Sequence, residues 1–340
     1  MGLTKSGDVA SRFSAYIEGL ASVIGHVGRA KPLRDYRTGL MMPCDRKRVE
    51  PMAAITAPER TAAQHQALLH LVGQGDWSDQ QVLGKIRELA LPGIERHGEI
   101  EAWIIDDTGF PKKGRHSVGV ARQLRSVGQA RQLSGCCDAF AREPSCGLPV
   151  AYRLYLPREW ATDRVRRRKT GVPKDITFKT KPAIALDHLR WACAVGLPRG
   201  VVPMDAGYGP IPLCWEYTEL GLSYVAGILP QTSVWALRTG PRPPMKWSGN
   251  GRSPKLPRRD SKHRPISVTK LAIGLPAHAW HKITCREGTA EQLSSRFARV
   301  RVRPAPVLVN SGGPSLVLRK QPSGSMRRGR LPMPRSLRRD

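Results

Sequence analysis

The 340-residue chain lacks features that mark several classes of protein. It has no run of 18 apolar residues, so no membrane span is expected. Its first residues, MGLTKSGDVASRF, hold no apolar stretch of the kind a signal peptide needs. Its seven cysteines form no CxxC pair, which argues against zinc and favours free thiols in a reducing cytoplasm. Aromatic residues make up only 6%, yet 40% hydrophobic content can build a sizeable core in two or three domains.

Acidic residues are also scarce, with 27 Asp and Glu against 56 Lys and Arg, and the formal net charge is +29. Such a surplus favours a nucleic-acid partner through counterion release, without specifying a base sequence. A ribosomal or membrane-surface protein would be equally basic. Six residues in two short basic runs are candidates for phosphate contacts, although a solvated surface is the commoner meaning of such runs. They are Arg46, Lys47, Arg48, Lys112, Lys113 and Arg115.

The acids that stand out end two predicted strands. The segment IIDDTGFPKKGRHSVG (104–117) carries Asp106 and Asp107, and the segment VVPMDAGYG (201–209) carries Asp205. A carboxylate at the end of a buried strand is costly unless a cation neutralises it, and Mg²⁺ prefers oxygen ligands of this kind. Each segment alone is equally well explained as a capped turn, since Asp and Gly are turn formers.

Periodicity of the apolar residues divides residues 1–305 into three parts, and the tail over 306–340 is the fourth. Residues 1–98 predict an N-terminal helical domain, with Ile17 and Leu20 on the apolar stripe of its first helix, a helix over Thr61–Val72 and a capped helix start at Ser78 with Gln81. Residues 99–233 alternate strand and helix signals, as an α/β body does, and 201–229 predict a β-α-β unit. Residues 234–305 form an inserted segment; it opens with a Pro-, Gly- and Arg-rich stretch that predicts a DNA-facing arm or a plain linker.

Several of these segments together resemble the DDE transposases of bacterial insertion sequences (DDE superfamily endonucleases), whose catalytic domain is RNase H-like. The resemblance is carried by WIIDDTGFPKKGRHSVGVARQ, LPVAYRLYLPREWATD, GVPKDITFKTKPAIAL and MDAGYG, and it covers most of the chain. It implies an α/β fold with an RNase H-like mixed sheet, in which 99–233 is the catalytic core and 1–98 a DNA-binding or accessory region. It also implies two Mg²⁺ or Mn²⁺ ions, Asp106 as the first acid with Asp107 as its fallback, and Asp205 as the second.

The resemblance further implies a third carboxylate, a glutamate on a late helix, for which the sequence offers no candidate. Glu287 and Glu291 match the inserted segment, and after them only Asp340 is acidic. Residues 306–340 contain eight Lys and Arg against one acid and no aromatic residue. We therefore expect a fold that is incomplete at the C-terminus and a disordered, basic, out-of-frame tail over 306–340.

Residues 124–147 depart from the resemblance in a second way. The stretch LRSVGQARQLSGCCDAFAREPSCG holds three of the seven cysteines and no strand pattern. A neighbouring reading frame allowed by the genetic code gives YAVLGKQDNCQVAVTLSLANHHAA, which alternates like a strand. We infer a compensated double frameshift, with a genuine variable loop as the alternative. The sheet is then expected to lose a strand beside the one that carries Asp106.

The predicted function is DNA transposition by metal-dependent strand cleavage and transfer, inactive in this truncated copy for lack of the third acid. The alternatives are a catalytically dead DNA-binding fragment and a pseudogene product without a selected function. The expected partners are DNA, as element ends and as target, with a second copy of the chain as a further candidate and no membrane. The expected location is the cytoplasm, in association with DNA.

Overall fold

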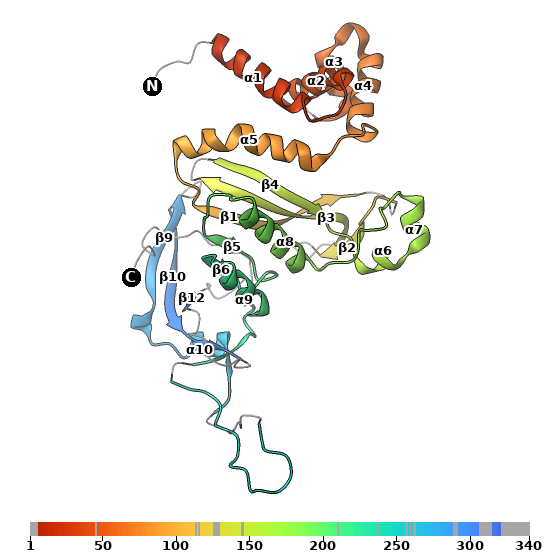
Figure 1. The fold of residues 1–340 in the computed structure, drawn as a ribbon. Helices are drawn as coiled ribbons and strands as arrows, with labels where there is room; N and C mark the ends of the chain where they lie inside the picture. Colours follow the sequence, from red (N-terminus) through yellow and green to blue (C-terminus); the bar gives the residue numbers. More distant parts are fainter. Residues whose placement is uncertain are drawn as a thin grey trace.

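The computed structural model describes residues 6–44, 46–112, 114, 116–124, 130–143, 146–209, 211–236, 238–255, 258, 260, 263–287, 292–305 and 315–320. In this part of the chain, no helix is both long enough and apolar enough to cross a membrane. A helical head, a mixed sheet flanked by helices, and a group of short strands follow one another along the sequence (Figure 1).

Four helices form the head. Ile17 and Leu20 are buried three residues apart on the first helix, as the apolar stripe predicted. The helix predicted from Thr61 begins at that residue. The four helices are α1 (Ser6–Ala21), α2 (Ala30–Met41), α3 (Val49–Thr56) and α4 (Thr61–Gly73).

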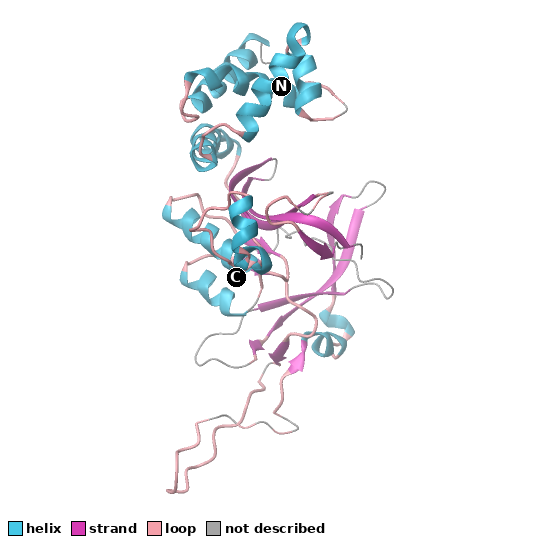
Figure 2. Ribbon diagram, turned by 90° about the vertical axis from the view of Figure 1, so that its right-hand side faces the viewer, coloured by secondary structure: helices cyan, strands magenta, loops and turns pink. Residues whose placement is uncertain are grey.

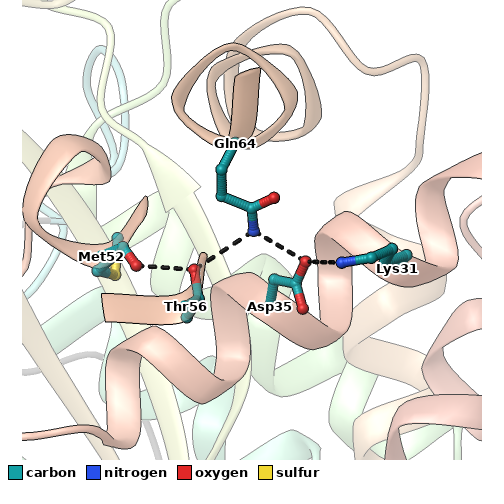
Figure 3. A network of polar contacts seen from close by, with 5 residues as sticks. All are labelled: Lys31, Asp35, Met52, Thr56 and Gln64. Carbon is teal, nitrogen blue, oxygen red and sulfur yellow. Dashed lines mark hydrogen bonds and ion pairs between the residues drawn. The ribbon is translucent and has the colours of Figure 1, made fainter. Parts of the chain in front are cut away.

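A polar network joins α2, α3 and α4 (Figure 3). Gln64 is only 4% exposed, and its amide nitrogen donates to Asp35 Oδ2 at 2.8 Å and to Thr56 Oγ1 at 3.3 Å. Thr56 donates in turn to the Met52 carbonyl at 2.8 Å, and Lys31 pairs with Asp35 at 2.6 Å. Because a buried amide without partners costs about 1–3 kcal/mol, these bonds favour one packing of the three helices.

The long helix α5 (Asp79–His97) lies between the head and the sheet (Figure 1). Its first turn is capped as the sequence predicted, since the Ser78 side chain accepts from the Gln81 amide at 3.3 Å. The Tyr152 hydroxyl, on a strand of the sheet, donates to Asp79 at 2.9 Å. The start of α5 is therefore held to the sheet by a side chain 73 residues away.

The central sheet is mixed. Strand β3 pairs antiparallel with β1, β2 and β4, and β5 pairs parallel with β6. The Trp103 amide donates to the Val201 carbonyl at 2.9 Å and joins β5 to β1 in parallel. The strands are β1 (Ala102–Pro111), β2 (Ala121–Leu124), β3 (Ala130–Glu143), β4 (Cys146–Leu154), β5 (Val202–Met204) and β6 (Tyr224–Ala226). Four strands with antiparallel pairing and two with parallel pairing form the mixed sheet expected of an RNase H-like fold, so that prediction is confirmed.

Helices flank the sheet and close its core. Tyr152 contacts α5 while its neighbour Arg153 pairs with Asp187 of α8 at 3.5 Å, so the two helices lie on different sides of β4. The core between α8 and the sheet includes Trp103, Ile105, Ile184, Leu189 and Val202. The helices of this body are α6 (Arg158–Thr162), α7 (Arg164–Lys169), α8 (Lys181–Ala194) and α9 (Ile211–Glu219), and the last completes the predicted β-α-β unit.

The prediction that residues 124–147 cost the sheet a strand is wrong. Ala130–Glu143 form β3, the longest of the described strands, and its register with β1 sets Asp138 opposite Asp106. Two small residues on alternate positions, Ala139 and Ala141, are buried. Backbone hydrogen bonds to strands on both sides stabilise β3, and they do not depend on side-chain polarity. The two buried alanines pack its apolar face against the core. The altered reading frame itself stays a prediction.

The rest of the chain adds two small antiparallel sheets, in the orders β12-β10-β9 and β11-β7-β8. Six residues of the expected disordered tail form β12 and pair with β10, so the tail prediction is wrong for 315–320. Between β7 and β8 the described residues form loops that reach away from the body (Figure 2). The elements are β7 (Ser233–Trp235), β8 (Ile266–Ser267), α10 (Val268–Ile273), β9 (His281–Glu287), β10 (Gln292–Arg301), β11 (Arg303–Pro304) and β12 (Ser315–Lys320).

Candidate functional site

The two adjacent acids of β1 face different sides of the sheet. Side chains alternate along a strand, so Asp107 shares a face with Trp103 and Ile105, which are both buried against α8. Asp106 belongs to the other face, and its Oδ1 accepts from the Asp107 amide at 2.8 Å. Asp107 therefore lies where the core on the α8 side meets solvent.

Asp107 is held by two residues that are distant in sequence. The Tyr208 hydroxyl donates to its Oδ1, and the Lys181 ammonium lies 2.9 Å from its Oδ2. Tyr208 is 2% exposed, whereas the side chains of Lys181 and Asp107 keep 26% and 35% of their surface in solvent. The carboxylate thus accepts from a buried hydroxyl on one oxygen and meets a half-buried cation on the other.

Asp205 occupies the turn that follows β5. Its Oδ1 accepts from the Gly207 amide at 2.7 Å, and its carbonyl accepts from the Tyr208 amide at 3.1 Å. This tight turn places Tyr208 so that its hydroxyl contacts Asp107. The two acidic segments that the sequence singled out therefore meet through Tyr208.

Glycines let the turn approach the end of β6. The Gly227 amide donates to the Met204 carbonyl at 2.9 Å. A Cβ added to Gly209 would lie 2.1 Å from the Gly227 carbonyl oxygen, and one added to Gly227 would lie 2.7 Å from the Ala206 amide. Both obstacles are backbone atoms, which cannot rotate away. The position of Asp205 therefore depends on two residues without side chains.

Lys181 is fixed at the start of α8. The Thr180 hydroxyl caps this helix by accepting from the Ala183 amide at 3.3 Å, and the Lys181 ammonium also lies 5.5 Å from the centre of the Tyr155 ring. A cation on an aromatic face and beside a carboxylate is favoured by both. Lys181 thus carries its positive charge to the place where the sequence predicted a metal ion.

The wall behind the turn is built from aromatic rings. The Tyr217 hydroxyl donates to the Tyr208 carbonyl at 3.3 Å, and the Tyr217 and Tyr224 rings meet edge to face at 5.6 Å. Burial raises the pKa of the Cys214 thiol above its ordinary value of 9.0, and burial likewise raises the pKa of Tyr224 above 10.0. Both groups are therefore neutral at pH 7 and act as packing rather than as nucleophiles.

The described residues contain no group of three or more His, Cys, Asp and Glu placed to hold a metal ion. Asp107 and Asp205 are oxygen donors of the type that Mg²⁺ takes. The side chains of Glu287 and Glu291 lie outside the described residues.

The four predicted phosphate contacts that the structure describes lie in two separate places. Lys112 is exposed just after β1, on the strand that carries Asp107, and Lys113 and Arg115 fall outside the described residues. Arg46, Lys47 and Arg48 are exposed in the head, which α5 separates from the sheet (Figure 1). Lys47 donates to the carbonyls of Gly39 and Met42, so it closes the C-terminal end of α2.

Lys181 and Tyr208 are site residues that the sequence reasoning missed. Two signals were available in the sequence. One is the tyrosine of DAGYG, and the other is the lysine before Pro182. Proline is common in the first turn of a helix, so Pro182 indicates that a helix begins near Lys181. Neither signal names Asp107 as a partner. That contact spans 74 residues to Lys181 and 101 to Tyr208, and it exists only in the folded chain.

Comparison with known proteins bears on the family of the chain. A search of curated proteins finds no match. The family model described as DDE superfamily endonuclease matches residues 20–292, a range that contains β1, α8, the turn at Asp205 and most of the helical head. On that match, which spans well over half of its length, the chain belongs to the DDE superfamily endonucleases.

Proposed function

We propose that this chain is a transposase-type protein of an insertion sequence that binds DNA and holds a divalent ion weakly between Asp107 and Asp205. The observation that carries the proposal is the hydrogen bond from Tyr208 to Asp107, because it couples the acid of β1 to the turn that bears Asp205. This proposal makes Asp107, the fallback of the sequence reasoning, the first acid in place of Asp106.

The residues fit a divalent ion of modest affinity. Asp107 and Asp205 supply carboxylate oxygens, and a bound Mg²⁺ or Mn²⁺ would act there as a Lewis acid toward a phosphodiester. Lys181 lies 2.9 Å from Asp107 and partly neutralises it, so binding of an ion must compete with this ammonium. With two acids and a competing cation, we expect weak binding.

The chain's own residues have separable tasks at this site. Tyr208 orients the Asp107 carboxylate by donating to one of its oxygens, and Gly209 with Gly227 allows the close approach that sets the turn. Lys181 offers a positive charge to an incoming phosphate. The apolar wall of Tyr217 and Tyr224 keeps water from the inner side of the turn.

We further propose that this 340-residue chain neither cleaves nor joins DNA. The resemblance to DDE transposases implies a third carboxylate that completes the metal site, and the sequence after Glu291 contains Asp340 as its only acid. What this proposal leaves to the chain is DNA binding, which its net charge of +29 supports.

Titration calorimetry with Mn²⁺ or Mg²⁺ tests the site. We expect weak binding to the full chain that Asp107→Ala and Asp205→Ala each abolish. Asp106→Ala is the matched control, because it removes an identical charge one residue away on the other face, and it should bind the ion as the parent does. Loss of binding in Asp106→Ala with retention in Asp107→Ala would reverse the assignment of the first acid.

A strand-cleavage assay with Mg²⁺ and a duplex substrate tests the second proposal, with intact duplex as the expected product. Metal-dependent nicking that Asp205→Ala removes would contradict the claim of inactivity while supporting the site. Binding of the duplex should weaken steeply between about 50 and 200 mM salt. Affinity that does not change with salt would contradict the DNA-binding proposal.

A further inference from the structure

Helix α7 is the most basic element of the described chain, since its sequence RVRRRK holds five cations in six residues. Two of the five have structural tasks. The Arg167 guanidinium donates to the carbonyls of Ala161, Pro173 and Ile176 at 3.1, 2.6 and 2.7 Å, and it thereby ties the helix to the loop that follows. The Arg166 guanidinium lies 3.8 Å from the centre of the Trp160 ring.

The other three cations, Arg164, Arg168 and Lys169, have no such task. All three are exposed, and none of their side chains forms a hydrogen bond, ion pair or ring contact with the described part of the chain. The neighbouring acid Asp163 is already used, because its carboxylate caps the helix by accepting from the Arg166 amide at 2.9 Å.

Helix stability does not explain these three side chains. Arg164 is the first residue of α7, at the positive end of the helix dipole, where a cation is unfavourable. Arg164 and Arg168 are four residues apart and therefore repel each other on one face. Val165, one turn before Lys169, is 77% exposed, so the adjoining face with Lys169 is not covered by another part of the described chain. An external anion would remove the repulsion.

Helix α6 connects α7 to two segments that adjoin the candidate site in sequence. The Trp160 indole of α6 donates to the Val120 carbonyl at 2.8 Å, in the segment that follows β1. The Arg158 guanidinium of α6 lies 4.8 Å from the centre of the Phe178 ring, three residues before Lys181. The basic helix is thus held, through α6, to the segment after β1 and to the segment before Lys181.

We infer that the surface formed by Arg164, Arg168 and Lys169 binds the phosphate backbone of duplex DNA and holds it beside the candidate site. The inference rests on the proposed DNA-binding function and specifies one surface for it. Cations that extend from a helix without acidic partners can bind DNA phosphates. Phosphate groups are the same at every base pair, so such contacts give no information on base sequence. Binding there positions the duplex without selecting its sequence.

The test is fluorescence anisotropy of a short labelled duplex with the full chain and a triple variant, Arg164→Gln, Arg168→Gln and Lys169→Gln. Arg166 and Arg167 are kept so that the helix stays attached. The matched control is Arg96→Gln, Lys270→Gln and Lys282→Gln, which removes the same charge from exposed positions on three other elements. Thermal unfolding of both variants should match the parent, since all six positions are exposed.

We expect the α7 variant to bind duplex DNA at least about tenfold more weakly at 50 mM salt, and the control to change far less. The slope of log affinity against log salt should fall by about 2.7 for the α7 variant, since each phosphate contact contributes about 0.9. Equal losses in the two variants would overturn the inference while leaving DNA binding intact. The same measurement is made with an RNA duplex. If the α7 variant loses affinity for the RNA duplex but not for the DNA duplex, the inference is also overturned. If the parent chain shows no salt-dependent DNA binding, the proposed function is refuted instead.

Discussion

A double-mutant cycle between Asp107 and Tyr208 tests whether the two acidic segments meet as described. The Tyr208 hydroxyl donates to a carboxylate from a side chain that is 2% exposed, so water does not easily replace it. A hydrogen bond to a charged group contributes about 1.5–3 kcal/mol to the free energy of unfolding. The pair between Asp107 and Lys181 is more open to solvent and adds about 0–1 kcal/mol.

From these contributions we expect Asp107→Ala to lower the free energy of unfolding by about 1.5–4 kcal/mol and Tyr208→Phe by about 1.5–3 kcal/mol. The double variant should be no worse than the more damaging single variant, because both changes remove one hydrogen bond. The coupling energy of the cycle is then about 1.5–3 kcal/mol. Urea unfolding followed by tryptophan fluorescence measures all four proteins.

The control cycle pairs Asp106→Ala with Tyr208→Phe. Asp106 lies on the other face of β1, so its coupling energy with Tyr208 should be close to zero. A coupling below about 0.5 kcal/mol for the Asp107 cycle would refute the contact, because that value is the scatter between independent sites. A larger coupling for Asp106 than for Asp107 would show that the strand faces the opposite way.

The remaining predictions concern glycines and buried acids. Gly227→Ala should lower the free energy of unfolding by about 1–3 kcal/mol and weaken Mn²⁺ binding, because its Cβ would meet the backbone of the Asp205 turn. Gly84 lies inside α5, and a Cβ added there would meet no atom within 4 Å, so Gly84→Ala should raise the free energy of unfolding by about 0.5–1 kcal/mol. Urea unfolding measures both glycine variants. Burial raises the pKa of the Cys214 thiol, so the contribution of the neutral thiol to stability is complete below pH 9.0 and is lost as the pH rises further. The free energy of unfolding should therefore fall less above pH 9.0 for Cys214→Ala than for the parent. Mass spectrometry should show exposed Cys146 alkylated faster than Cys214, and equal rates would contradict the burial.

The sequence by itself determined the features that arise from neighbouring residues. Ser78 predicted the start of α5, because a capping side chain acts within one turn. The strand and helix signals from 201 to 229 predicted a β-α-β unit, and β5 and β6 pair in parallel as it requires. The motifs around Asp107 and Asp205 were sufficient to indicate the DDE family, because members of a family share short characteristic segments of sequence.

Only the tertiary structure decided which acid of β1 lies on the α8 face and what surrounds it. Two adjacent aspartates look alike in sequence, and the choice of Asp107 depends on which face of β1 packs against α8. Pairing with strands on both sides likewise seats β3, a segment whose own pattern predicted no strand. Contacts such as Lys181 with Asp107 form because the chain returns to the same place after 74 residues, and no local pattern records that return.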